Sequence, residues 1–330
     1  MAANHTDVCM KLTEYEAEGT NDEEADILFN TSLVCGFLLV FIVGICGNTM
    51  VIYLSFSPTF SKAVNTMNTY IFHLGVADAM YVFASLFFTV TNFNRRGWVF
   101  GEVGCKVIPA IDIITMHVSV YVLGILSLER YLALVKPMVI NRYRSWYYAR
   151  VLCVLVWVSG ISLTVPSATN MKLIRVGGEG ESCEWSSGPD SHRRYIVSVF
   201  WITFAVPSLV MLLTYAMLFI HFTKVGPNQN ASHVVSRSRR GVVSIVILIV
   251  GVYWICFTPF WVYQMMLVYD KCNLFDQHNT MGLITLILSY LNSCVNPFLY
   301  TLLPRKYNIW RKSKRIRGGR TVSFRLRNFD

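Results

Sequence analysis

Seven long apolar segments constrain what this chain can fold into. Each can supply the roughly 20 residues with which an α-helix crosses a hydrocarbon layer about 30 Å thick. The segments are 33–56, 67–91, 103–135, 148–169, 195–222, 241–268 and 280–303. With 54% hydrophobic and only 15% charged residues, a chain of 330 residues has the composition of a membrane protein. The sequence therefore predicts an all-α, seven-transmembrane helix bundle.

Charged residues divide unevenly along the chain and predict its orientation. Residues 1–32 are acidic, whereas ten Lys and Arg residues follow Pro304. Basic residues favour the cytoplasmic side, so we expect the N-terminus outside, where Asn4 and Asn30 are glycosylation candidates. We expect four parts: an extracellular acidic N-terminal tail (1–32), the transmembrane domain (33–303), a short amphipathic eighth helix on the inner leaflet (304–316) and a basic cytoplasmic tail (317–330).

Four cysteines fall on the side predicted to be extracellular. Cys105 lies at the top of the third segment and Cys183 in the loop after the fourth. A disulfide between them would hold that loop over the helix ends. Cys9 and Cys272 are a second candidate pair, because spacing alone leaves the connectivity open.

The third segment carries polar groups along one helical face. An α-helix from Cys105 to Arg130 rises about 37 Å, which leaves Asp112 roughly 10 Å below the outer interface and Glu129 at the inner one. A polar face inside a membrane must look into protein or a water-filled cavity. The face consists of residues three or four apart: Asp112, Met116, Ser119, Leu123, Leu126 and Arg130. This arrangement indicates a protein that passes a signal across the bilayer.

Asp78 is a carboxylate near the middle of the second segment. An unpaired charge there costs at least a few kcal/mol, so the group needs a proton, a cation or several hydrogen-bond donors. Oxygens for a sodium ion, acting as an allosteric modulator, would come from Asp78, Ser119, Asn292, Ser293 and Asn296. A protonated or water-bridged structural aspartate is the alternative. We expect no other metal or cofactor and no enzyme activity, since no phosphate loop, catalytic triad spacing or metal motif appears.

These motifs together resemble the rhodopsin-like (class A) family of G-protein-coupled receptors. They occur in order along the helices: Gly47-Asn48, Leu74 with Asp78, Cys105, Glu129-Arg130-Tyr131, Trp157, Pro207, Tyr215, Phe257-Thr-Pro259 and Asn296-Pro297-Phe-Leu-Tyr300. Asp112 with Met116 four residues on resembles the peptide receptors of the somatostatin, opioid and urotensin group, and the urotensin type most. Phe257 stands where the wider family usually has tryptophan, which is a trait of the urotensin type. Glu129 replaces the commoner aspartate.

The resemblance implies an extracellular cyclic peptide as the ligand. A basic side chain of the peptide would bind Asp112. The predicted walls of the pocket are Met116, Phe257, Phe260, Trp261, Gln264 and Tyr290. Two alternatives stay open: Asp112 is paired within the protein while the aromatic residues are core, or the ligand is a small amine.

On the inner side the resemblance implies a heterotrimeric G protein, and arrestin as a further partner, at the plasma membrane. Glu129 would hold Arg130 in the inactive state until the sixth helix swings outward about Pro259. The other predicted coupling and switch residues are Tyr131, Met138, Tyr215, Pro297 and Tyr300. We expect the Gq, phospholipase C and calcium route, with Gi coupling of a somatostatin- or opioid-like receptor as the alternative.

Other membrane proteins with polar helices fit the sequence less well. A retinal-linked photoreceptor needs a lysine in the seventh segment, and residues 280–303 contain none. A transporter would favour repeated halves with broken helices, and no internal repeat is visible. The net charge of +10 does not indicate nucleic acid, because the basic residues are not interleaved with aromatics on a soluble face.

Overall fold

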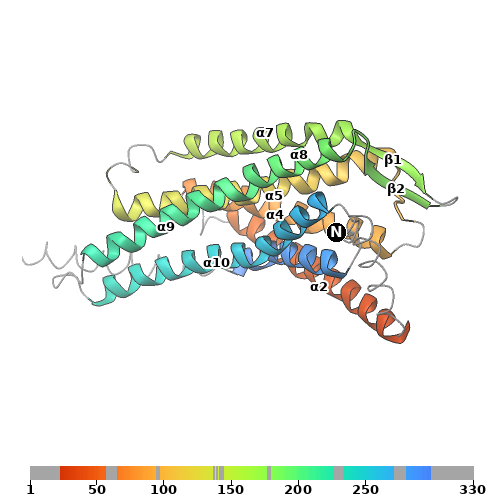
Figure 1. Cartoon of the computed structure of the whole chain (residues 1–330). Coiled ribbons are helices and arrows are strands. Elements are labelled where there is room, and N and C mark those ends of the chain that lie inside the picture. Colours follow the sequence, from red (N-terminus) through yellow and green to blue (C-terminus); the bar gives the residue numbers. More distant parts are fainter. Residues whose placement is uncertain are drawn as a thin grey trace, which may run out of the picture.

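The computed structural model describes residues 23–56, 65–93, 97–136, 138, 140, 145–176, 180–225, 233–270 and 280–298. Figure 1 shows long helices packed side by side, with a two-stranded β-hairpin at one end. In chain order the elements are α2 (Glu23–Ser55), α4 (Asn65–Phe93), α5 (Gly101–Val135), α7 (Trp146–Asn170), β1 (Met171–Val176), β2 (Gly180–Trp185), α8 (Pro189–Phe200), η1 (Trp201–Ala205), α9 (Val206–Val225) and α10 (His233–Tyr269). A last described helix, Thr280–Phe298, follows.

Seven helices are long and apolar enough to cross a membrane, which confirms the predicted count. Six lie within α2, α4, α5, α7, α10 and Thr280–Phe298, and the fifth in chain order runs through α8, η1 and α9. The helix bounds differ from the apolar runs at several ends. α2 already begins at Glu23 and α10 at His233, because a helix continues beyond the hydrocarbon for as long as its backbone hydrogen bonds persist.

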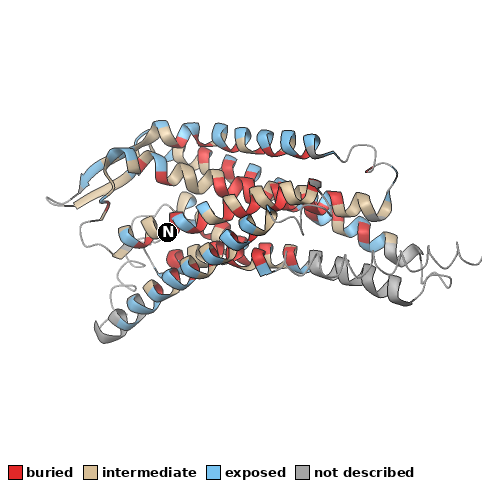
Figure 2. Cartoon of the chain, turned by 180° about the vertical axis from the view of Figure 1, so that it is seen from behind, coloured by how far each residue is buried: buried red, intermediate tan, exposed pale blue. Residues whose placement is uncertain are grey.

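The bundle buries polar side chains and exposes apolar ones. Ile42, Leu155 and Ile255 are more than half exposed, whereas Asp78 and Ser289 are fully buried. Figure 2 shows the same division, with buried residues along the helix faces that meet inside the bundle. Lipid can solvate the apolar outer faces but not the polar groups, which must find partners between helices. The predicted inward polar face of the third segment follows this rule.

Close helix contacts occur where the sequence has small residues. A Cβ atom added at Gly47 would lie 3.0 Å from Cγ of Pro297, so α2 and the last helix approach each other at this glycine. The amide of Asn48 donates to the carbonyl oxygens of Gly44 (2.9 Å) and Ser293 (3.0 Å). Glycine and an amide thus join the two helices, as small and polar residues commonly do in membranes.

The fifth span contains a π-helical turn that the sequence analysis did not foresee. In η1 the amide of Val206 donates to the carbonyl oxygen of Trp201, five residues earlier. Pro207 follows directly, and its ring would clash with the carbonyl of Thr203 in a regular α-helix. Widening the preceding turn by one residue accommodates the proline without ending the helix.

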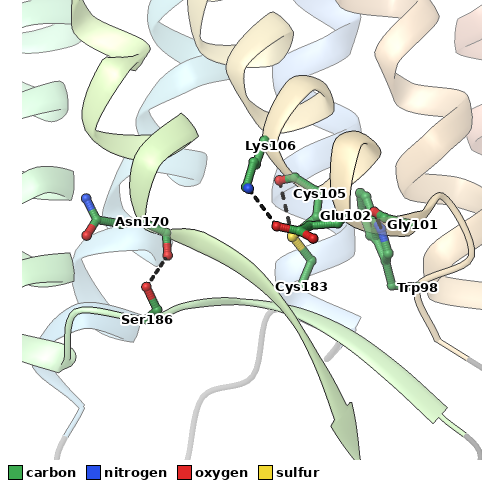
Figure 3. Close-up of a disulfide and its surroundings, with 8 residues drawn as sticks. All are labelled: Trp98, Gly101, Glu102, Cys105, Lys106, Asn170, Cys183 and Ser186. Atoms are coloured by element: carbon green, nitrogen blue, oxygen red, sulfur yellow. Dashed lines mark hydrogen bonds and ion pairs between the residues drawn. A yellow bond between two sulfur atoms is a disulfide. The ribbon is translucent and has the colours of Figure 1, made fainter.

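A β-hairpin covers the end of the bundle at which α7 and α8 meet. β1 and β2 pair antiparallel, with Leu173 opposite Cys183. A disulfide joins Cys183 to Cys105 on α5, with 5.5 Å between the two Cα atoms, as predicted (Figure 3). Figure 3 also shows the Ser186 hydroxyl donating to the Asn170 carbonyl at the other end of the hairpin (2.8 Å). The hairpin is therefore held at both α5 and α7.

Several predictions lie outside the described residues. They concern Asn4, the side chain of Asn30, the pair Cys9 and Cys272, Tyr300, the helix expected over 304–316 and the tail 317–330.

Candidate functional site

A cavity of about 340 Å³ lies between the hairpin and the helix ends. Its lining comes from α4, α5, α7, both strands, α8, α10 and the last helix. Five predicted ligand-binding residues are among the lining: Asp112, Met116, Phe260, Trp261 and Gln264. The five predicted residues thus come from two helices, α5 and α10, and meet at one cavity, which has the size of a small binding pocket.

Asp112 is the one carboxylate that the sequence predicted in this cavity. It lies on α5, seven residues after the disulfide-bonded Cys105. Its carboxylate accepts a hydrogen bond of 3.0 Å from the hydroxyl of Tyr290. Among the described residues no Lys, Arg or His pairs with it. The carboxylate therefore faces a cavity with only a neutral partner, and within the described structure it is neither turned to lipid nor internally ion-paired.

Two predicted wall residues lie elsewhere than expected. Phe257 and Tyr290 are fully buried and do not line the cavity. The ring centroid of Tyr81 lies 6.5 Å from that of Phe257 and 4.5 Å from that of Tyr290. The Tyr81 hydroxyl shares a hydrogen bond of 2.9 Å with the Ser289 hydroxyl. Tyr81, Phe257 and Tyr290 therefore form an aromatic layer in the buried core. Tyr290 still touches the site through its bond to Asp112.

The hairpin and α8 also line the cavity, which the sequence did not predict. Glu181, Cys183 and Trp185 of β2 line the cavity, as do His192 and Tyr195 of α8. The Trp185 ring stacks on both, with centroid distances of 5.2 Å to His192 and 5.0 Å to Tyr195. The predicted disulfide carried the signal that would have found them, because it brings the neighbours of Cys183 to the top of α5.

The predicted polar core assembles around Asp78. Its carboxylate accepts three hydrogen bonds of 2.8 Å, from Ser119, Ser293 and Asn296. Both side-chain amide atoms of Asn292 are buried, and no described group pairs with either. Carboxylate, hydroxyl and amide oxygens are the ligand types that hard cations prefer. The donor set thus fits a small cation, and the three donors also satisfy the carboxylate without one.

At the other end of the bundle the predicted switch residues Glu129 and Arg130 contact α4, and Tyr215 of α9 contacts α5. The hydroxyl of Tyr70 on α4 donates to Glu129 (3.0 Å), and the guanidinium of Arg130 donates to the sulfur of Met67 on the same helix. Tyr215 donates to the hydroxyl of Ser127 across 2.8 Å. One neighbouring helix, α4, therefore contacts both members of the Glu-Arg motif.

Three further switch residues have distinct surroundings. Met138 is 84% exposed, which leaves its side chain accessible for a contact with another molecule. Tyr131 is half-buried on α5. Pro259 lies inside α10, where it leaves a backbone carbonyl without its helical donor.

The sequence matches known receptors over most of its length. Residues 47–300 match the family described as 7 transmembrane receptor (rhodopsin family). The urotensin-2 receptor of Homo sapiens is 34% identical over 271 residues, which cover 81% of this chain and 67% of that receptor. The urotensin-2 receptor of Bos taurus is 32% identical over 292 residues, covering 87% and 74%. Somatostatin receptor type 1 of Rattus norvegicus is 31% identical over 285 residues, covering 84% and 68%.

The family match, the seven spans and the disulfide between Cys105 and Cys183 agree with the resemblance that the motifs indicated. The chain therefore belongs to the rhodopsin family of seven-transmembrane receptors, which makes it a multi-pass plasma-membrane receptor and not an enzyme.

Proposed function

We propose that this receptor responds to an extracellular cyclic peptide that carries a basic side chain, as a urotensin-II-like peptide would. The observation that carries the proposal is Asp112, a carboxylate at a cavity whose one described partner is the neutral hydroxyl of Tyr290. An ammonium or guanidinium from a ligand would supply the missing opposite charge through a charge-assisted hydrogen bond. The names of the similar receptors, urotensin-2 and somatostatin, support a peptide as the ligand class.

The size of the cavity supports entry of part of a peptide. A volume of about 340 Å³ is at the lower end of the range for small-ligand pockets. It accommodates one or a few side chains, with the remainder of the peptide at the hairpin. Met116, Phe260 and Trp261 would provide apolar and aromatic contact to those side chains.

A small amine is the second candidate, since it too would need Asp112. Recognition of a hydroxylated amine requires hydroxyl groups that face the ligand. The hydroxyl candidates in the fifth span are Ser198, Thr203 and Ser208. Ser198 donates to the Arg194 carbonyl and Thr203 to that of Val199, both at 2.8 Å, whereas Ser208 shares a hydrogen bond of 3.2 Å with Tyr253 of α10. None of the three lines the cavity. These contacts favour the peptide.

Signal transfer would follow from a shift between two arrangements of the bundle. The ligand stabilises the active arrangement only to the extent that it binds that arrangement more tightly. Outward movement of α10 about Pro259 would open the end that carries Arg130 and Met138 to a heterotrimeric G protein, and later to arrestin. We propose an extracellular N-terminus and the Gq, phospholipase C and calcium route. Gi coupling is the alternative.

A sodium ion at Asp78 would modulate this equilibrium. The oxygens of Asp78, Ser119 and Ser293 would bind it, and the unpaired amide oxygen of Asn292 supports a further polar ligand there. A sodium titration of agonist affinity tests this. Replacing NaCl by choline chloride should raise agonist affinity in the wild type but not in Asp78→Asn, and an equal response of both would contradict the site.

One assay separates the proposed ligand classes and G proteins. Transfected cells expressing the wild type, Asp112→Ala or Asp190→Asn are challenged with urotensin-II, somatostatin and an opioid peptide, with calcium and cyclic AMP as readouts. Asp190 is an exposed carboxylate paired with Arg193 at the same end of the bundle and serves as the matched control. We expect a calcium response that Asp112→Ala abolishes at unchanged surface expression and that Asp190→Asn preserves. An unchanged dose–response curve for Asp112→Ala would refute the proposed pocket.

A further inference from the structure

The cavity carries negatively charged side chains although the chain as a whole has a positive net charge. The chain carries a formal charge of +10, yet the described residues that line the cavity include two carboxylates and no Lys or Arg. One carboxylate is Asp112 on α5. The other is Glu181 on β2, which the sequence analysis did not single out. A wall of this kind attracts cations and discriminates against anions.

The register of the hairpin places Glu181 on the face of β2 that looks into the molecule. Side chains two apart along a strand point to the same side, so Glu181, Cys183 and Trp185 share one face. Cys183 is bonded to α5, and Trp185 stacks on α8, which identifies this face as the inner one. Glu184 belongs to the opposite face and is exposed.

The backbone holds Glu181 firmly while its side chain has no described partner. The carbonyl oxygen of Glu181 accepts a hydrogen bond of 2.7 Å from the amide of Trp98. Arg175 stands opposite Glu181 in the hairpin, but no hydrogen bond or ion pair within 4.0 Å joins them. The described structure therefore presents a half-buried carboxylate at the cavity on a fixed backbone.

The disulfide between Cys105 and Cys183 limits how far apart Asp112 and Glu181 can lie. Asp112 lies seven residues from Cys105, or about 10 Å along a helix. Glu181 lies two residues from Cys183, or about 7 Å along a strand. Since the Cα atoms of the two cysteines are 5.5 Å apart, the Cα atoms of Asp112 and Glu181 lie at most about 23 Å from each other. Two long basic side chains of one small cyclic peptide can span this distance.

We propose that Glu181 is a specificity-determining residue that binds a second cation of the ligand, so that the receptor selects dicationic peptides over monocationic ones. This inference rests on the proposed peptide-receptor function. Asp112 would bind the deep cation and Glu181 the one nearer the hairpin. Because Glu181 is half-buried, its pair with the second cation should change affinity by roughly five- to tenfold.

The test uses disulfide-cyclised peptides that carry two lysines one to three residues apart, and analogues with either lysine replaced by norleucine. Binding is measured on the full-length wild type and on Glu181→Gln and Glu184→Gln. We expect the wild type and Glu184→Gln to bind a dilysine peptide five- to tenfold more tightly than the analogue that lacks the outer lysine. In Glu181→Gln this preference should fall below twofold. Glu181→Lys should instead prefer an analogue with glutamate at the outer position.

Two results would overturn the inference. If Glu181→Gln weakens dilysine and monolysine peptides equally, the residue has a structural role only. If the wild type shows no preference for two lysines, the second cation has no site, although an Asp112-dependent response would leave the proposed function intact. A wild type that binds no cationic cyclic peptide would overturn both proposals.

Discussion

The hydroxyl of Tyr290, on the last described helix, donates a hydrogen bond of 3.0 Å to the carboxylate of Asp112 on α5. Tyr290 itself is fully buried and does not line the cavity. The Asp112 carboxylate at the cavity is thus hydrogen-bonded to a core residue that does not itself line the cavity. A cation bound to Asp112 would compete with Tyr290 for the carboxylate and so change the strength of this hydrogen bond. The cavity is therefore linked directly to the helix that carries Asn292, Ser293 and Asn296.

Tyr290→Phe should weaken agonists about tenfold. A hydrogen bond to a charged group contributes roughly 1.5–3 kcal/mol, and without it the ionised form of Asp112 is less favourable. Radioligand competition and calcium dose–response curves measure the effect. Tyr81→Phe is the control, because it removes a buried hydroxyl bond to Ser289 in the same aromatic layer but none to Asp112. Equal losses in both variants would mean that the effect is one of core packing.

Cys183→Ser should abolish high-affinity binding. The disulfide positions the inner face of β2, including Glu181 and Trp185, over the cavity. Closing a loop of 78 residues also restricts the unfolded chain and stabilises the fold by a few kcal/mol. Cell-surface binding should fall by more than tenfold, whereas Cys153→Ser, at a buried free cysteine on α7, should retain it. Retained binding in Cys183→Ser would show that the hairpin holds its place without the bond.

Gly44→Ala should lower the thermal stability of the purified receptor. A Cβ atom at Gly44 would lie 2.8 Å from both Cγ atoms of Val82, so α2 and α4 must move apart. Overpacking of this kind costs about 1–3 kcal/mol. At Gly124 no atom lies within 4 Å of an added Cβ, so Gly124→Ala should leave the melting temperature unchanged or raise it. A thermal-shift assay in detergent compares the two, and equal melting temperatures would contradict the close approach.

Arg130→Ala should eliminate G-protein activation while agonist binding persists. Arg130 lies 18 residues beyond Asp112 on α5, about 27 Å along the helix, so the change cannot touch the cavity directly. Calcium release should fall to the basal level at unchanged surface expression. A variant that signals as well as the wild type would remove Arg130 from the proposed coupling mechanism.

The sequence was most informative about the transmembrane helices. Apolar length predicted the spans, and the spacing of Asp112, Met116 and Ser119 correctly predicted an inward polar face, because both depend on local chain geometry. The partners of Asp78 were also predictable, since a carboxylate at mid-membrane must collect whatever polar groups the facing helices carry.

The parts that could not be predicted depend on tertiary position. Phe257 and Phe260 are three residues apart on α10 and equally aromatic, yet only Phe260 lines the cavity. Phe257 shares the helical face of Trp261 and Gln264, which line the cavity, so it differs by lying about one turn deeper along α10. The disulfide places the neighbours of Cys183 near the site, but it does not show that Glu181 and Trp185 point inward, because their direction follows from the strand register and from stacking on α8.

The π-helical turn of η1 also sets the direction in which α8 faces. Buried positions on this span run Tyr195, Val199, Thr203 and Pro207, and continue with Ser208 and Met211. The two adjacent buried positions Pro207 and Ser208 accommodate the extra residue of the wide turn, so both halves face the bundle interior although the helix passes through a proline. Deleting one residue between 201 and 205 would rotate α8 by about 100° relative to α9. Tyr195 would then turn towards lipid, so the geometry of one wide turn determines whether the cavity has its aromatic wall.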